Sequence, residues 1–140
     1  MLSYTPPKSS DFGPNYYTVD GESSIVFASA RTGNTSVLNN KFQWDGSNFL
    51  DAYRAKIGGE GEKVEVERFD RGIKSKYHEG PVSFSNNGTI MYLTRSNYLN
   101  RKKGLDSAKH NNLKLYISRK DSNGKWGELT EFPYNSDNYS

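Results

Sequence analysis

The chain has 140 residues, a formal net charge of +3 and no cysteine. This length suits one small domain, and the absence of thiols excludes a disulfide framework, a thiolate zinc site and a cysteine nucleophile. Hydrophobic residues are scarce at 33%, whereas aromatic residues reach 14%, a balance that favours small β-sheets over a disordered chain. The weakly basic charge indicates a mixed-charge surface, and we expect no nucleic-acid partner.

Short runs of β-branched and aromatic residues alternate with clusters of Gly, Asn, Asp and Ser along the chain, and helical periodicity is almost absent. Such runs predict strands joined by turns. The expected strands cover residues 15–18, 24–29, 49–55, 63–68, 82–85, 89–94, 114–118 and 126–131. We expect no direct membrane span, because no apolar run is long enough for one. Residues 1–10 also lack the apolar core of a signal peptide.

The second half of the sequence repeats the first with a nearly constant offset in residue number. The matching positions are Gly13-Pro14 with Gly80-Pro81, Gly21 with Gly88, Tyr53 with Tyr116, Phe69 with Phe132, and Tyr77 with Tyr139. Four short strands per repeat are typical of a β-propeller blade. Each repeat is longer than a common blade, and the extra length falls in two polar segments, residues 32–48 and 96–112, which we expect to be loops.

The repeat defines the expected organisation of the chain. Residues 1–10 would form an N-terminal extension, residues 11–76 the first repeat, residues 77–138 the second, and residues 139–140 the start of a further one. The sequence therefore predicts an all-β fold made of two four-stranded antiparallel blades of a partial β-propeller. Because a closed propeller needs about 4–8 blades, we expect further blades in a parent chain or in an oligomer.

Each repeat is expected to begin with the same hairpin. Gly-Pro opens the first strand, and a tight turn follows at residues 19–21 or 86–88, where Asn, Asp and Gly tolerate positive φ. Another turn is expected at residues 121–124. The second strands carry apolar runs at residues 25–28 and 90–93. These runs predict that both strands are buried on both faces, between neighbouring blades.

These motifs resemble a known family. The runs FGPxxY, IVFASxR, KYHEGPVSFS, LKLYI and FPYNSDNYS are similar, in this order, to the TolB-like propeller repeats of OmpA-family envelope proteins from the Bacteroidetes group. The resemblance covers residues 11–140 and implies a periplasmic propeller associated with the outer membrane. Some members are similar to components that anchor the type IX secretion machinery to the cell wall. Blade-shaping roles are expected for Gly13, Pro14, Gly21, Trp44, Tyr53, Gly80, Pro81, Gly88, Tyr116 and Trp126.

Two features depart from the family pattern. The usual Ser-Pro-Asp-Gly turn is replaced here by Ser85-Asn86-Asn87-Gly88, which still consists of turn-forming residues. The peptidoglycan-binding domain that usually follows the propeller is missing from this sequence. Cell-wall anchoring would therefore belong to a parent protein and not to these residues.

The sequence offers no assembled catalytic or metal-binding set. His78 and His110 are the only histidines, whereas a zinc site needs three or four ligands. Residues 121–124 begin like a calcium-binding EF-hand loop, but Phe132 stands where the bidentate glutamate belongs. No nucleophile elbow and no phosphate-binding loop is present. We therefore predict a protein that is not an enzyme and binds no cofactor and no metal.

The main basic cluster is Arg101-Lys102-Lys103, with Tyr98 close by in the sequence. The predicted binding residues are Tyr98, Arg101, Lys102 and Lys103. They would suit an acidic partner, a lipid head group or a glycan phosphate. The plainer alternative is a solvated loop tip.

Together these observations predict a non-enzymatic scaffold or binding module of the bacterial envelope. Its partner would be an envelope protein or a peptidoglycan-associated complex, and its location the periplasm at the outer membrane. Two alternatives stay open: a non-catalytic propeller portion of a larger hydrolase, and a glycan-binding module that uses exposed Tyr and Trp. Trp44 and Trp126 are interpreted as packing residues, because aromatic side chains supply much of the buried area of a lean core.

Overall fold

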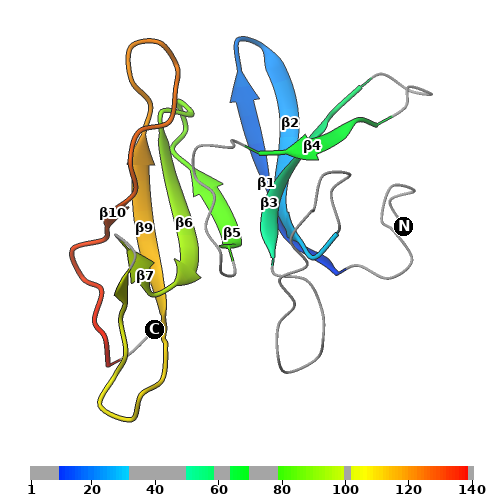
Figure 1. The fold of residues 1–140 in the computed structure, drawn as a ribbon. Coiled ribbons are helices and arrows are strands. Elements are labelled where there is room, and N and C mark those ends of the chain that lie inside the picture. Colours follow the sequence, from blue (N-terminus) through cyan, green and yellow to red (C-terminus); the bar gives the residue numbers. More distant parts are fainter. Residues whose placement is uncertain (1–9, 32–49, 59–63, 70–78, 100–101, 139–140) are drawn as a thin grey trace.

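The computed structural model of the chain describes residues 10–31, 50–58, 64–69, 79–99 and 102–138. These segments contain ten strands and no helix. The strands are β1 (Asp11–Val19), β2 (Glu22–Ser29), β3 (Asp51–Lys56), β4 (Val66–Arg68), β5 (Glu79–Phe84), β6 (Ile90–Ser96), β7 (Tyr98–Leu99), β8 (Lys102–Lys103), β9 (Leu113–Arg119) and β10 (Thr130–Glu131). They form a first sheet, β1-β2-β3-β4, a second sheet, β10-β9-β6-β5, and a β7-β8 hairpin (Figure 1). All pairs are antiparallel.

Each of the eight strands expected from the sequence has a counterpart, which confirms the all-β prediction. The last of them, expected at residues 126–131, is reduced to β10 and an isolated bridge between Lys120 and Trp126. The expectation that residues 96–112 form only a loop is wrong, because this segment contains β7 and β8. Their arms hold two residues each, too few to show an alternating pattern. The loop expected at residues 32–48 lies outside the described residues.

Tight turns join the strands where the sequence predicted them. Asp20 and Gly21 take φ angles of 52° and 80°, the pair of positive values that a two-residue type I′ hairpin turn requires. Gly88 and Gly124 also take positive φ, at 65° and 75°. Asp121 stabilises the last of these turns, because its carboxylate accepts hydrogen bonds from two backbone N–H groups of the turn, each at 2.9 Å.

Both Gly-Pro pairs form β-bulges. The strand register shifts at each pair, within residues 12–15 of β1 and within residues 79–82 of β5. Proline has no N–H to donate, so it fits a position that leaves the ladder. The two bulges also touch, because a Cβ on Gly13 would lie 2.7 Å from the Cβ of Pro81. Gly13 therefore combines a positive φ of 62° with a close contact between the sheets.

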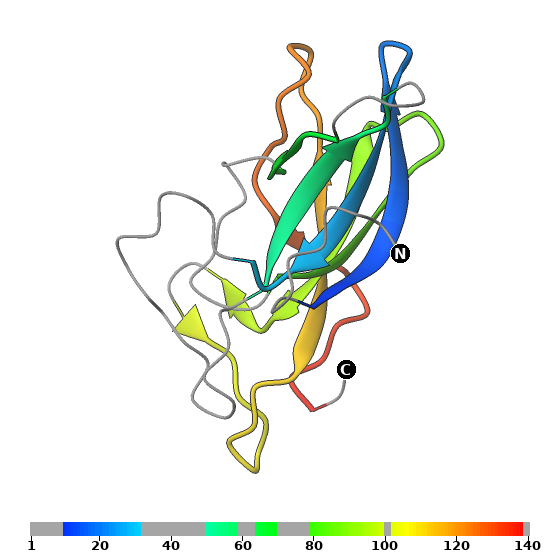
Figure 2. The same cartoon turned by 90° about the vertical axis from the view of Figure 1, so that its right-hand side faces the viewer.

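The two sheets pack against each other through one core. β5 is the strand of the second sheet that lies nearest to the first (Figure 1), and Figure 2 shows the first sheet in front of the second. The core joins buried side chains from both sides. Its members are Tyr17, Val26, Ala52 and Phe69 from the first repeat and Val82, Met91, Leu93 and Trp126 from the second.

Four aromatic rings fill one part of this core. Every pair of them has ring centroids between 4.4 and 6.4 Å apart, and the rings are those of Tyr17, Phe69, Phe84 and Trp126. The Lys120 ammonium lies 5.0 Å from the Tyr17 ring centre and 5.1 Å from that of Trp126. This aromatic cluster therefore links the sheets, and Trp126 is only 9% exposed within it.

Equivalent backbone bonds fix how the third and fourth strands of the two sheets correspond. The Phe69 N–H donates to the Ala52 carbonyl at 3.0 Å, and the Phe132 N–H donates to the Leu115 carbonyl at 3.0 Å. Both bonds join the segment around the fourth strand to the third strand. Phe69 therefore corresponds to Phe132, and Ala52 corresponds to Leu115, with the same offset in residue number that relates Tyr53 to Tyr116.

Strand pairing carries this match to the first and second strands. Phe27 pairs with Tyr53, and Leu93 pairs with Tyr116, the counterpart of Tyr53. Phe27 therefore corresponds to Leu93. In the first strands the ladder matches Asp11 with Glu79. Gly13 stands two positions after Asp11, whereas Gly80 directly follows Glu79. The two Gly-Pro pairs are therefore displaced by one position relative to each other in the aligned strands.

The sheets meet through unlike faces. We call the side that carries the pair Phe27–Tyr53, or its counterpart Leu93–Tyr116, the trailing face of each sheet, and the opposite side the leading face. Leu93 belongs to the shared core, whereas Phe27 and Tyr53 form a separate cluster. The leading face of the first sheet, which carries Val26, therefore covers the trailing face of the second.

The outer faces differ in coverage. On the trailing face of the first sheet, Phe27 and Tyr53 are each 3% exposed, and the Arg31 guanidinium lies 5.0 and 5.2 Å from their ring centres. In β6 and β9, buried residues alternate strictly with partly or fully exposed ones. The prediction that residues 90–93 are buried on both faces is therefore wrong. Their strand lacks a covering element on its leading face among the described residues.

Candidate binding surface

The predicted basic cluster lies on the β7–β8 hairpin beside the second sheet (Figure 1). Tyr98 pairs with Lys103, and Leu99 pairs with Lys102. The structure thus brings Tyr98 and both lysines onto one small hairpin, and the Lys103 side chain is exposed. Arg101, the fourth predicted binding residue, lies outside the described residues.

A buried asparagine holds the base of the hairpin. Asn97 is 4% exposed. Its backbone N–H donates to the Asn112 carbonyl at 3.1 Å, and its carbonyl accepts the Gly104 N–H at 3.0 Å. The Asn111 side-chain amide donates to the Asn97 and Gly104 carbonyls, at 2.8 and 2.6 Å. A Cβ on Gly104 would lie 2.0 Å from the Asn97 amide nitrogen, so only glycine allows this close approach.

A lysine and two carboxylates tie the C-terminal segment to the same base. Lys114 Nζ lies 2.7 Å from the Asp137 carboxylate and 3.1 Å from that of Glu131, and its side chain is only 8% exposed. The Asn97 side-chain amide also donates to Asp137, at 2.8 Å. We call these four residues the Lys114 clasp. The clasp connects β9, β10 and the hairpin base, which are far apart in the sequence.

The clasp shifts the proton affinities of its ionisable groups. Burial acts to lower the pKa of Lys114, but the hydrogen bonds and negative charges of Asp137 and Glu131 outweigh it and raise that pKa. The hydrogen bond from Lys114, followed by the one from Asn97, lowers the pKa of Asp137. Both shifts favour the charged pair, so the clasp is an ion pair at neutral pH.

A solvent-facing turn follows the hairpin. The Asp106 carboxylate accepts the backbone N–H groups of His110 and Ala108 at 2.7 and 2.9 Å, and lies 3.2 Å from His110 Nδ1. These bonds, led by the one from the His110 backbone, hold the pKa of Asp106 below its ordinary value. The described residues contain no group of three or more His, Asp or Glu side chains that could hold a metal ion. His78 lies outside them.

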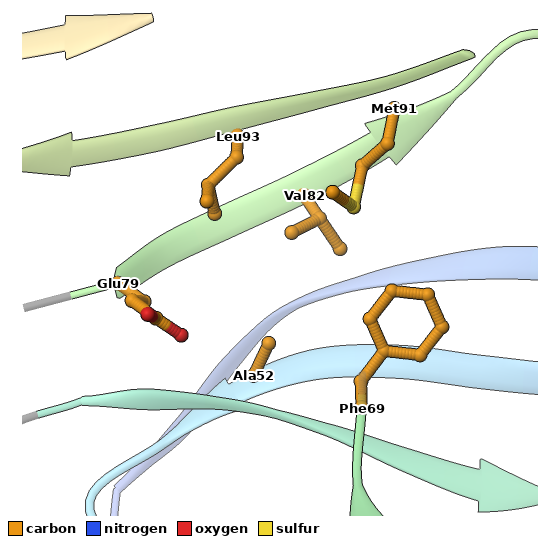
Figure 3. Close-up of a pocket in the computed structure, with 6 residues that line it drawn as sticks. All are labelled: Ala52, Phe69, Glu79, Val82, Met91 and Leu93. Carbon is orange, nitrogen blue, oxygen red and sulfur yellow. The ribbon is translucent and has the colours of Figure 1, made fainter. Parts of the chain in front are cut away.

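An inner cavity lies between the sheets and has a volume of about 10 Å³. Its lining residues are Ala52, Phe69, Glu79, Val82, Met91 and Leu93 (Figure 3). A space of this size is about enough for one water molecule, so it cannot hold a substrate. Glu79 is 5% exposed, and its carboxylate reaches toward the space between the sheets (Figure 3).

An outer hollow of about 730 Å³ lies at the β1–β2 turn and the end of β3. Its volume is in the range of ligand pockets. Its charged side chains have both signs and are Asp20, Glu22, Arg54 and Lys56. Arg54 is already paired with Glu67, at 2.5 Å. The hollow thus lacks the one-signed or strongly apolar lining that would select a class of ligand.

The residues expected to shape the blades occupy bulges, turns and strands of the two sheets, apart from Trp126, which lies in an isolated bridge, and Trp44, which lies outside the described residues. The residues that hold the hairpin were not predicted; they are Asn97, Asn111, Lys114 and Asp137. Their only sequence signal is polarity: Asn97 and Asn111 lie in an expected loop, Lys114 begins an expected strand, and Asp137 belongs to the FPYNSDNYS run. Polarity alone usually indicates exposure, so the burial of Asn97 and Lys114 could not be read from it.

Comparison with known proteins finds no family model, no curated protein and no solved structure that matches the chain. In the described segments, no helix has the length and apolar character needed to cross a bilayer. Function is therefore inferred from the hairpin, its polar base and the packing of the sheets.

Proposed function

We propose that the protein is a non-enzymatic interaction module that binds an acidic partner through the β7–β8 hairpin. The observation that carries this proposal is the buried polar base beneath a basic hairpin. Asn97 and Lys114 are 4% and 8% exposed, and burial of such groups is costly unless they are fully bonded. A base of this kind holds the hairpin in one orientation, which lowers the entropic cost of binding.

The two sheets are proposed to be neighbouring blades of a β-propeller. Two features support this: each repeat forms a four-stranded antiparallel sheet, and unlike faces of the two sheets pack together. Rotation around a propeller axis brings the same pair of unlike faces together at every step. In a sandwich of two sheets related by a two-fold axis, like faces would meet.

The proposed setting is the periplasm at the outer membrane, within an OmpA-family protein. It rests on the resemblance of the sequence motifs to TolB-like repeats. The partner would then be an envelope protein or a peptidoglycan-associated complex with an acidic surface. The hairpin offers two lysines at adjacent positions, which would attract such a surface and steer its approach.

The experiment compares two double variants that change the net charge equally. Lys102→Glu/Lys103→Glu alters the hairpin, and Lys56→Glu/Lys125→Glu alters exposed lysines elsewhere. Binding is measured to purified peptidoglycan sacculi by co-sedimentation and to poly-glutamate by fluorescence anisotropy. We expect the hairpin variant to lose about tenfold in affinity for at least one probe and the matched control to lose little. Equal losses of affinity in both variants, or no binding of either probe by the chain without substitutions, would contradict the proposal.

A further inference from the structure

The leading face of the second sheet is an apolar surface without charge over most of its extent. It is formed by alternate residues of β6 and β9 that are partly or fully exposed. They are Ile90, Tyr92, Thr94, Ser96, Leu113, Leu115, Ile117 and Arg119. Charged residues make up 25% of the whole sequence, yet the one charge in this set is Arg119, at the end of β9. An apolar patch with its charge at the margin marks a surface that binds another protein surface.

The first sheet shows what covers such a face. Its leading face carries Val26, Ala28 and Ala52, which are 0%, 1% and 7% exposed. The correspondence of the strands gives their counterparts in the second sheet as Tyr92, Thr94 and Leu115. In the first sheet, Val26 and Ala52 lie in the core that is shared with the trailing face of the second sheet, which is built by the second copy of the repeat. Side chains at the same positions of the second sheet remain partly exposed.

Within the described segments, no uncovered trailing face is left for this purpose. That of the second sheet is already packed on the first. That of the first sheet lies beneath Arg31, which is paired with Asp11 at 2.7 Å. It also lies beneath Arg68, which is paired with Asp51 and whose guanidinium is 5.9 Å from the Tyr53 ring centre. Head-to-tail stacking of a second copy of this chain would bury these two ion pairs, and the removal of ion pairs from water is costly.

We propose that the leading face of the second sheet binds a third four-stranded sheet of the same repeat, joined in tandem after the Lys114 clasp. The proposal rests on the assignment of the two sheets as propeller blades, and it names the surface on which the next blade would pack. The junction between the existing repeats supports a tandem link. The Glu79 N–H, at the start of β5, donates to the Leu50 carbonyl at 2.9 Å. Leu50 stands two positions before Ala52, and Leu113 stands two positions before Leu115, so Leu113 is the counterpart of Leu50. Leu113 is 46% exposed, and a third repeat could dock there as the second repeat does at Leu50.

The test uses the absence of cysteine from the chain. Thr94→Cys places one thiol at the centre of the leading face, and Ser122→Cys places one in the exposed turn between β9 and β10. Each is made in the 140-residue chain and in a chain with a third repeat, built by appending a copy of residues 77–138 after Asn138. The rate of reaction with a thiol reagent is measured for all four proteins, and far-ultraviolet circular dichroism records the added strands.

We expect the third repeat to slow the reaction of the Thr94→Cys thiol by about tenfold or more, since the counterpart Ala28 is almost completely buried, and to leave the Ser122→Cys thiol unchanged. Adding Tyr92→Lys to the three-repeat chain should restore fast reaction, because it places a charge in the apolar contact. Equal rates with and without the third repeat, or a third repeat that does not fold, would overturn the proposal. So would protection of the thiol in the two-repeat chain that increases with protein concentration, since a second copy would then be the occupant.

This result can be separated from the test of the hairpin. Thiol protection reports on the leading face, whereas the charge-reversal variants report on binding by β7 and β8 in the chain with two repeats. A chain that binds acidic probes but accepts no third repeat would retain the proposed binding function and lose the proposed docking surface.

Discussion

The two sheets have the same strand order and differ in how they are covered. Both begin with a Gly-Pro bulge, and both place the pair Phe27–Tyr53 or its counterpart Leu93–Tyr116 on the trailing face. In both, an equivalent backbone hydrogen bond joins the residue after the fourth strand to the third strand. Only the first sheet is buried at these central positions on both faces. Strand pairing is thus a property of each repeat, whereas burial is a property of its neighbours.

This difference explains where stability is concentrated. Burial of apolar surface contributes about 25 cal/mol per Å² removed from water. The face between the sheets holds the aromatic cluster and the larger of the two core clusters, so it contributes more stabilisation than the smaller cluster around Phe27 and Tyr53. The leading face of the second sheet contributes little until another surface covers it.

The largest expected effect comes from a matched pair of substitutions on opposite faces of the second sheet. Leu93 is 1% exposed in the shared core, and Leu115 is partly exposed on the leading face. Leu93→Ala should lower the free energy of unfolding by about 3 kcal/mol, because it leaves a cavity between the sheets. Leu115→Ala should cost about 1 kcal/mol or less. Urea unfolding followed by circular dichroism gives both values, and similar losses would contradict the difference in coverage.

A second pair of substitutions tests the contact between the bulges. Gly13→Ala combines a residue with positive φ, which costs about 1–2 kcal/mol, with a Cβ only 2.7 Å from Pro81. Gly124→Ala meets a similar φ of 75° but has no atom within 4 Å of the added Cβ. We expect Gly13→Ala to destabilise the protein by about 1 kcal/mol more than Gly124→Ala, since the clash forces a shift. If thermal melting shows the same loss for both, the bulges do not press against each other in solution.

Much of the strand order could be predicted from the sequence because strands and tight turns leave local signals. Short runs of apolar residues predicted β6 and β9, and the Val-Asp-Gly run at residues 19–21 predicted a tight turn that requires positive φ. The covering of a strand face by another element leaves no local signal in the sequence. The apolar runs at residues 25–28 and 90–93 look alike, yet only the first is covered on both sides, because burial depends on which element packs nearby.

The candidate site was predictable only in part for a related reason. The basic cluster marks itself by charge, so Lys102 and Lys103 could be identified. The clasp beneath it could not, because Asn97, Lys114 and Asp137 lie up to 40 residues apart and meet only when β6, β9 and the C-terminal segment converge. A lysine in a strand usually has an exposed charge, and only the structure shows that Lys114 is buried against two carboxylates.

The smallest expected effect is a pH dependence confined to this clasp. Because the folded-state pKa of Asp137 lies below its ordinary value of 3.8, its stabilising contribution is present above pH 3.8 and is lost as the pH falls through the folded-state pKa. The pKa of Lys114 is raised above 10.5. Its contribution is therefore present below pH 10.5 and is lost as the pH rises through the folded-state pKa. Between these limits the clasp should stay closed.

The nuclear magnetic resonance signal of the Asn97 side-chain amide, which donates to Asp137, reports directly on the acid limit. This signal should shift with a midpoint below pH 3.8 in the chain without substitutions, and the transition should be absent in Asp137→Asn. Glu128→Gln, on an exposed residue, serves as the control and should leave the transition in place. The Trp126 fluorescence should stay constant through it, because Trp126 belongs to the core between the sheets. A transition that Trp126 shares would mean that the sheets separate together with the clasp, and that the hairpin base is not an independent unit.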